Sequence, residues 1–310
     1  MVLRQAMLAA SRSDAMQTAA TATPFTRGVV RRFVAGEDVA DAVHAAADLA
    51  GAGLHCSIDH LGEKVTDAEQ ANAAVVAYLR LLEALSVADL TDRAEVSLKL
   101  SAVGQALPQD GHEVALANVH QICQLASTLG TTVTLDAEDH TTIDATLETL
   151  RALREDFPGT GAVLQAYLKR TEADCKDLSF EGSRVRLCKG AYAEPASVAF
   201  QASHDVDLSY VRCLKILMAG QGLPMIATHD PKLVEIAGAI AVRTGRERGS
   251  YEYQMLYGVR PEEQRRLAAI GEKVRVYVPY GAQWYPYLVR RMAEKPANLG
   301  LFLRAMSSKA

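Results

Sequence analysis

The chain has 310 residues, of which 49% are hydrophobic and 23% charged, an ordinary composition for a globular protein. Its formal net charge of −4 argues against nucleic acid or another polyanion as a partner. Five cysteines without CxxC spacing, no secretory leader and no apolar run of about 18 residues indicate a cytoplasmic protein with reduced thiols and no membrane span.

The first 50 residues predict an N-terminal helical segment, 1–50, because alanine-rich stretches of helical period are separated by the helix-breaking residues Pro24 and Gly28. The rest of the chain, 51–310, shows a different and regular rhythm. We expect it to form one catalytic domain.

Short β-branched or aliphatic runs recur along this second part. They lie at 54–59, 95–102, 132–137, 162–168, 184–191, 224–229, 251–258 and 274–281. Amphipathic segments of helical period separate them, for example 67–85 and 231–245. Eight strands alternating with helices predict a closed parallel (β/α)8 barrel, the TIM barrel, of which about 250 residues are typical. An open doubly wound sheet is the alternative, and Gln165 and Gln254 interrupt the fourth and seventh strands.

Polar residues gather where the predicted strands end. They are Asp59, His60, Lys99, Ser101, Asp136, Gln165, Arg186, Lys189, Thr228, His229 and Tyr277. Barrel enzymes build their sites at the carboxyl ends of the strands, and an unpaired charge buried there is costly. Lys99 and Asp136, on neighbouring strands, could simply pair. The cations of the set outnumber a single carboxylate partner, however, so we expect the set to face a ligand.

A final helix is predicted after the eighth strand. Tyr287, Arg290, Arg291 and Glu294 are spaced i, i+3, i+4 and i+7, which places them on one helical face. The arginines could pair with Glu294 on the surface. Two guanidiniums beside a tyrosine can also clamp a carboxylate, and this helix can reach over the barrel mouth.

Two other kinds of site find no support in the residues. No GxGxxG motif follows any predicted strand, so a Rossmann-type nucleotide site is not expected. The stretch DAEDH (136–140) lacks the ligand spacing of a metal centre, and we expect no metal.

Eight ordered motifs resemble the proline dehydrogenase family, whose members are flavin-dependent. They are SLKLSA, LDAED, LQAYLKR, RLCKGAY, ATHD, YEYQMLYG, VYVPYG and YLVRR. The resemblance runs from about residue 50 to residue 305. It implies a distorted barrel that holds FAD noncovalently at the strand ends, with L-proline beside the isoalloxazine ring under the last helix. The implied reaction is hydride transfer from proline C5 to flavin N5, which yields Δ1-pyrroline-5-carboxylate.

The resemblance also implies roles for individual residues. Asp136 and Arg186 match catalytic positions, Asp136 as an acid that orders the site and Arg186 beside flavin N5. The positions that match cofactor contacts are Ala137, Gln165, Arg186, Lys189, Gly190, Ala191, Thr228 and His229. The positions that match substrate contacts are Lys99, Arg290 and Arg291 for the carboxylate and Tyr277 and Tyr287 for the ring. No base for the substrate amine is assigned.

The implied partners are a quinone as electron acceptor, which suggests transient contact with the inner face of a membrane, and a separate pyrroline-5-carboxylate dehydrogenase. The second follows because no aldehyde dehydrogenase module appears in the chain. Two other functions stay open at this point. Lys99 could form a Schiff base in a lyase, or the barrel could bind an acidic ligand without catalysis.

Overall fold

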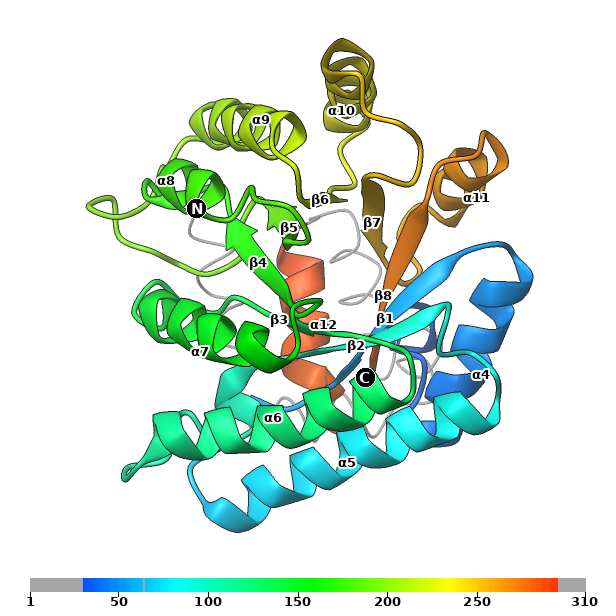
Figure 1. Cartoon of the computed structure of the whole chain (residues 1–310), viewed down its shortest axis with the longest axis vertical. Helices are drawn as coiled ribbons and strands as arrows, with labels where there is room; N and C mark the ends of the chain where they lie inside the picture. The colour runs from blue at the N-terminus through cyan, green and yellow to red at the C-terminus, as the bar shows by residue number, and fades with distance from the viewer. Residues whose placement is uncertain (1–29, 64, 295–310) are drawn as a thin grey trace, which may run out of the picture.

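A computed structural model describes residues 30–63 and 65–294 (Figure 1). The strands are β1 (His55–His60), β2 (Ala94–Leu98), β3 (Val133–Leu135), β4 (Gly161–Gln165), β5 (Arg184–Cys188), β6 (Leu223–Ala227), β7 (Glu252–Leu256) and β8 (Val274–Tyr280). The helices are α4 (Val39–Gly51), α5 (Ala68–Val87), the 3-10 turn η1 (Leu100–Ala102), α6 (Gly111–Thr128), α7 (Ile143–Asp156), α8 (Thr171–Asp177), α9 (Ser203–Ala219), α10 (Pro231–Thr244), α11 (Pro261–Ala269) and α12 (Trp284–Glu294).

The strands close into a parallel barrel in the order β1 to β8. The closing pair is β8 with β1, which runs in register from Arg275 opposite His55 to Tyr280 opposite His60. This closure confirms the predicted (β/α)8 barrel and excludes the open doubly wound sheet. The two strands interrupted by glutamine also form: Gln165 ends β4, and Gln254 pairs with Ala227 of β6.

Several predicted strands extend too far at their carboxyl ends. The second ends at Leu98 because the chain then turns into η1, where Ala102 N donates to Lys99 O at 3.1 Å. The third ends at Leu135 and the fifth at Cys188. The polar residues that follow therefore lie in the loops at the barrel mouth.

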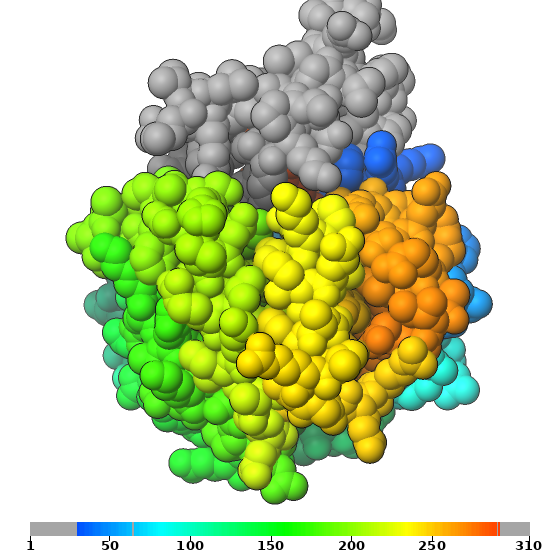
Figure 2. Space-filling model, turned by 90° about the horizontal axis from the view of Figure 1, so that it is seen from above, coloured from blue at the N-terminus to red at the C-terminus, as the bar shows by residue number. Residues whose placement is uncertain are grey.

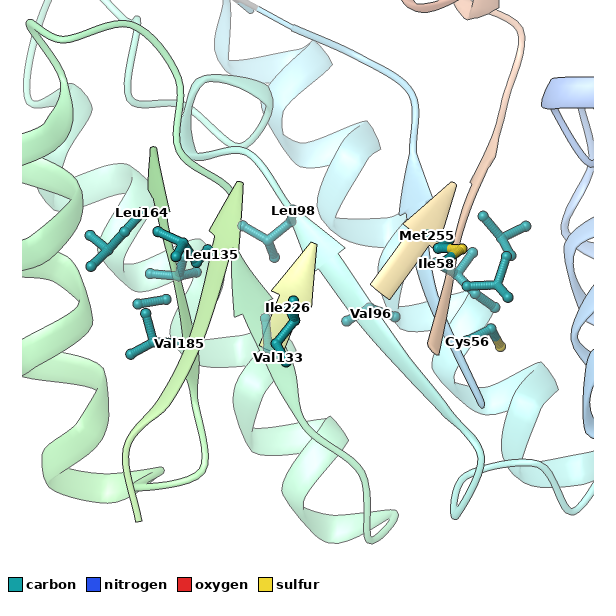
Figure 3. Close-up of a cluster of buried hydrophobic side chains, with 14 of the residues drawn as sticks. Cys56, Ile58, Val96, Leu98, Val133, Leu135, Leu164, Val185, Ile226 and Met255 are labelled. Carbon is teal, nitrogen blue, oxygen red and sulfur yellow. The ribbon is translucent and has the colours of Figure 1, made fainter. Parts of the chain in front are cut away.

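The main hydrophobic core lies between the strands and the surrounding helices, and the barrel interior is polar. Figure 3 shows alternate strand residues, such as Ile58, Leu98 and Leu135, directed to this core. Side chains of the intervening positions meet inside the barrel: Arg186 Nη2 on β5 donates to Ser57 Oγ on β1 at 3.1 Å. Most barrels of this class fill the interior with branched apolar side chains. Here charged and hydrogen-bonding side chains occupy it.

The outer helices cover this core with amphipathic faces. In α5, Asp67 caps the first turn by accepting from Gln70 N at 2.8 Å, and the buried positions recur at helical spacing, as at Tyr78, Leu81 and Leu85. Figure 2 shows the segments of α9, α10 and α11 side by side in one part of the outer wall. Buried residues of the outer helices and of the strands belong to one cluster.

The amino-terminal part is only partly as predicted. Residues 30–33 are helical, and α4 buries Ala42 in the same core cluster as the barrel strands. Residues 34–38 are not helical, because Ala35 N donates to Pro279 O and Gly36 O accepts from Gly281 N, each at 2.9 Å, beside β8. Residues 1–29 lie outside the described part, and the division of the chain at residue 50 stays a prediction.

Helix α12 lies across the barrel mouth, as predicted (Figure 1). Its apolar residues form a second cluster that includes Leu288 together with Leu61 after β1 and Val34, and Tyr277 of β8 and Val259 after β7 pack against that cluster. The helix therefore contacts several strand ends. It covers the place where the polar strand-end residues meet.

Candidate functional site

Five side chains, one from each of β1, β2, β3, β5 and β8 or the residue that directly follows the strand, form one buried group at the mouth, which we call the mouth network: Asp59, Lys99, Asp136, Arg186 and Tyr277. Lys99 Nζ lies 2.7 Å from Asp59 Oδ2 and 3.8 Å from Asp136 Oδ2. Arg186 Nη1 donates to Asp136 Oδ1 at 2.7 Å. The network brings together residues that are up to 218 positions apart in the chain.

Tyr277 joins the two carboxylates of the mouth network. Its hydroxyl lies 2.7 Å from Asp59 Oδ2 and 2.6 Å from Asp136 Oδ2, and the guanidinium of Arg186 lies over its ring at 5.3 Å. Burial, followed by the two carboxylates, raises the pKa of Tyr277 well above its usual value. The phenol is therefore neutral, and its single hydrogen can be donated to only one carboxylate at a time.

Lys99 is held in its charged form. Burial favours the neutral amine, but the carboxylates of Asp59 and Asp136 outweigh it, and the net effect raises the pKa of Lys99 above its usual value. The pKa of Asp59 is also raised, because burial there outweighs the attraction of Lys99. The mouth network thus contains a fixed cation beside a carboxyl group that takes up a proton more readily than usual.

A second group of charges lies deeper in the barrel, and we call it the lower network. It consists of Glu95, Arg184, Glu252 and Arg275. Arg275 Nε donates to Glu252 Oε1 at 2.8 Å, Arg184 Nη2 bonds Glu95, and Arg275 Nε lies 3.8 Å from Glu95 Oε1. Burial raises the pKa of Glu95, but the surrounding arginines, Arg184 first, reverse this and lower it.

The two networks correct one expectation. Among the described residues of the interior, the four cations Lys99, Arg184, Arg186 and Arg275 are matched by the four carboxylates Asp59, Glu95, Asp136 and Glu252. The expectation that cations outnumber carboxylate partners was therefore wrong. It weighed the strand-end cations against a single carboxylate, whereas Lys99 pairs with Asp59, Arg186 pairs with Asp136, and Lys189 pairs with Asp207 and Asp230.

Other predicted positions also lie around the mouth. Gln165 is buried, and its Nε2 donates to Glu138 O at 3.1 Å. Thr228 follows β6, and its Oγ1 accepts from Asp230 N at 3.1 Å. His229 Nε2 accepts from Leu256 N at 2.8 Å, which places its ring hydrogen on Nδ1 if the ring is neutral. Ala137 follows Asp136 and is partly buried.

The loop after β5 contains Lys189, Gly190 and Ala191. Lys189 Nζ lies 2.5 Å from Asp207 Oδ1 and 3.2 Å from Asp230 Oδ2. Gly190 has φ +109°, and a Cβ there would lie 2.2 Å from a ring carbon of Tyr167. A glycine is thus required by backbone conformation and by the Tyr167 ring, a reason that the sequence did not reveal. Ala191 is half-buried beside it.

Tyr287, Arg290 and Arg291 all belong to α12. Tyr287 is buried in the cluster of α12, and the guanidinium of Arg291 lies 5.5 Å from the centre of its ring. The side chain of Arg290 lies outside the described part. Tyr287 and Arg291 therefore lie together on one face of α12, as their spacing predicted.

Sequence reasoning assigned no role to several residues that bond the predicted ones: Ser57, Asp59, Glu95, Ser97 and Gln254. Asp59 was noted only as a strand end. Ser97 Oγ lies 2.8 Å from Asp136 Oδ1, and Arg186 Nη1 donates to it at 3.0 Å. A usable signal was present, because polar residues occupy alternate positions in β1, β2, β5 and β7.

Within the described ranges, no helix combines the length and apolar character needed to cross a membrane. In the stretch DAEDH, His140 Nδ1 bonds the carboxylate of Glu194.

Comparisons with known proteins identify similar sequences and folds. A sequence profile described as proline dehydrogenase matches residues 42–303. Proline dehydrogenase of Deinococcus radiodurans is 37% identical over 280 residues, covering 90% of each chain. Proline dehydrogenase 1 of Bacillus subtilis subsp. natto is 36% identical over 284 residues, covering 92% of each chain. The solved structure of proline utilization A from Bdellovibrio bacteriovorus, inactivated by N-propargylglycine, has a TM-score of 0.79 at 21% identity, covering 92% of this chain and 36% of that one, and supports the fold.

Proposed function

The chain belongs to the proline dehydrogenase family, and on that basis we propose that its barrel mouth oxidises L-proline to Δ1-pyrroline-5-carboxylate with FAD as cofactor. The observation that carries the proposal is the mouth network, which lies at the carboxyl ends of the strands inside the matched region. Family membership makes the chain an oxidoreductase that acts on proline. The cofactor, the acceptor and the residue roles are the proposed parts.

The residues present fit a flavin. Gln165 is 3% exposed, and its Oε1 is buried without a hydrogen-bond partner among the described residues. Such an atom is costly unless a donor reaches it, and the flavin ring carries an N–H group. Gln165, Thr228, His229 and the backbone at Ala137 would hold the ring system. Lys189, Gly190 and Ala191 would hold the pyrophosphate, and Arg186 would lie beside N5.

When bound, the flavin would supply the acceptor at N5 for the hydride that leaves C5 of proline. Lys99, Arg290 and Arg291 would bind the substrate carboxylate, and Tyr277 and Tyr287 would form the walls around its ring. The pairing of Lys99 with Asp59 supports this role, because it fixes the ammonium group and keeps it charged. Such positioning supplies much of the acceleration in an orientation-dependent transfer.

The substrate amine must lose its proton before or during hydride transfer. Lys99 cannot accept it while it is charged. We assign this proton to the carboxylates of Asp59 and Asp136, which Tyr277 links. Burial raises the pKa of Asp59, which makes it a stronger base than an exposed aspartate.

The Schiff-base alternative has no observation in its favour. A lysine nucleophile must be neutral, and the pKa of Lys99 is shifted in the opposite direction.

The test is a visible absorption spectrum of the purified protein. We expect flavin bands that L-proline bleaches in the absence of oxygen and that a soluble quinone restores. Both alternatives predict a colourless protein. A protein that neither contains flavin nor binds added FAD would contradict the proposal.

Tyr277→Phe is expected to lower kcat/KM for proline by about 10-fold to 100-fold. The ring stays, but the hydroxyl that bonds both carboxylates is lost, and a hydrogen bond to a charged group contributes about 1.5–3 kcal/mol. Steady-state kinetics with flavin content measured in parallel provide the check. Tyr253→Phe is the control, because Tyr253 faces the outer core of the barrel. Equal kinetics for Tyr277→Phe and wild type would remove Tyr277 from the site.

The proposed electron acceptor is a quinone, reached through transient contact with a membrane surface, and the product would pass to a pyrroline-5-carboxylate dehydrogenase. These three partners are supported by the motif resemblance alone. Reduction of a quinone embedded in lipid vesicles, compared with a water-soluble analogue, would test the first two.

A further inference from the structure

Gln254 connects the mouth network to the lower network. Arg186 Nε donates to Gln254 Oε1 at 2.5 Å, and Gln254 Nε2 donates to Glu252 Oε1 at 2.7 Å. Glu252 in turn accepts from Arg275 Nε at 2.8 Å. Gln254 is 4% exposed, so these bonds lie away from water.

The chemistry of this position requires one side chain that is neutral, accepts on one side and donates on the other. The partner above it is a guanidinium, which only donates, and the partner below it is a carboxylate, which accepts. Burial raises the pKa of Glu252, but Arg275 reverses this and the net effect lowers it, so Glu252 stays ionised. A glutamate at 254 would face that carboxylate, and a lysine would face Arg186. A primary amide satisfies both partners.

Each nitrogen of the Arg186 guanidinium has its own acceptors, and Gln254 is the acceptor for Nε. Nη1 donates to Asp136 and Ser97, and Nη2 donates to Ser57. These acceptors lie on β1, β2 and the end of β3, whereas Gln254 lies on β7. The guanidinium is thus bonded from opposite sides of the barrel, which fixes both its plane and its rotation.

We propose that Gln254 is a positioning residue for Arg186, holding the guanidinium through Nε while keeping the negative charge of Glu252 one side chain away. The inference rests on the proposed function, in which Arg186 lies beside flavin N5. A neutral residue at 254 leaves the charge of Arg186 available to the bound flavin. A negative residue there would offset that charge.

The first experiment observes Arg186 directly, in protein as purified and labelled with 15N-arginine. We expect a protected Nε–H resonance that is absent in Arg186→Lys, which assigns it, and that is lost or exchange-broadened in Gln254→Met. The matched control is Gln264→Met. Gln264 is equally buried, and its Nε2 donates to Leu256 O at 3.1 Å and Val259 O at 2.9 Å, away from Arg186. Gln264→Met should lower the melting temperature and leave the Nε–H resonance of Arg186 unchanged.

The second experiment measures the midpoint potential of the bound flavin. In Gln254→Glu we expect the preference for the reduced over the oxidised flavin to fall about tenfold. The midpoint potential would then be about 30 mV more negative, since the couple transfers two electrons. Gln264→Met should keep the wild-type potential. A residue that merely fills the interior would alter melting temperature in both variants and the potential in neither.

A protected Arg186 Nε–H resonance in Gln254→Met would overturn the proposal, as would a wild-type potential in a Gln254→Glu protein that binds flavin. Failure of the proposed function is distinguishable from these results. A wild-type protein without flavin would contradict the cofactor assignment, while the resonance of Arg186 would still report whether Gln254 positions it.

Discussion

Arg186→Met is expected to lower kcat for proline oxidation by about 10²–10³-fold and to reduce the flavin content of the purified protein. The guanidinium makes charge-assisted bonds in a buried site, and removing one donor to developing charge in such sites has costs of this size. Arg186 is 5% exposed and bonds Asp136 at 2.7 Å, so the variant also leaves that carboxylate short of a partner. Kinetics with saturating FAD, together with flavin content, separate weakened binding from slowed chemistry.

Two comparisons sharpen this prediction. Arg186→Lys keeps a charge but loses the planar fork that bonds several partners, so its activity should lie between those of wild type and Arg186→Met. Arg151→Met is the control, because Arg151 is exposed on α7. Full flavin content with an unchanged rate of flavin reduction by proline in Arg186→Met would show that Arg186 acts elsewhere.

Glu95→Gln is expected to destabilise the fold by about 3–5 kcal/mol, the usual cost of removing one partner from a buried ion pair. Glu95 is 2% exposed. Its carboxylate accepts from Ser57 Oγ at 2.9 Å and bonds Arg184, and its Oε1 lies 3.8 Å from Arg275 Nε. The amide keeps the shape but leaves the arginines without their counter-charge. Chemical denaturation provides the measurement.

The pH dependence of stability gives this variant a second readout. The pKa of Glu95 in the folded protein is lowered below its value in the unfolded chain, about 4.3. Its contribution is therefore complete above that value and is lost as the pH falls toward the folded pKa. Between pH 7 and pH 3, wild type should lose more stability than Glu95→Gln. The pKa of Asp59 is raised, so its contribution to the pH dependence of stability has the opposite sign. This contribution is common to both proteins and cancels in the difference between them.

The control for Glu95 is Glu155→Gln, since Glu155 is exposed on α7 and a surface change of this kind usually stays within about 0.5 kcal/mol. If Glu95→Gln matched this control in stability at neutral pH and at pH 4, the lower network would not support the barrel. Its charges would then be balanced by other groups.

Much of the barrel was readable because its signals are local. Strand periodicity, helix amphipathicity and cap residues such as Asp67 depend on residues close in sequence, and they located all the strands within a few residues. The carboxyl ends of several strands were predicted too far along the chain, because the residues that follow, such as Lys99 and Asp136, are polar yet continue an alternating pattern. The chain turns away from β2 where Ala102 N donates to Lys99 O at 3.1 Å, whereas Asp136 N, just past β3, still donates to Leu98 O of β2 at 2.8 Å.

The mouth network was only partly predictable. Lys99, Asp136, Arg186 and Tyr277 were identified by their place at predicted strand ends and by family motifs. Asp59 received no role, although it is the closest described carboxylate to Lys99, at 2.7 Å. Several carboxylates lie at strand ends, and the tilt and stagger of the strands in the closed barrel decide which of them faces a given lysine. The linear sequence does not specify the tilt or the stagger.

The sequence by itself determined the class of fold, the order of its strands and the set of polar residues carried to one end of the barrel, because these follow from local periodicity. The tertiary structure alone decided the pairing. Arg186 lies 68 positions from Gln254 and 129 from Ser57, yet it bonds both. Closure of β8 onto β1 creates a shared interior, in which each buried charge must find a partner from another strand.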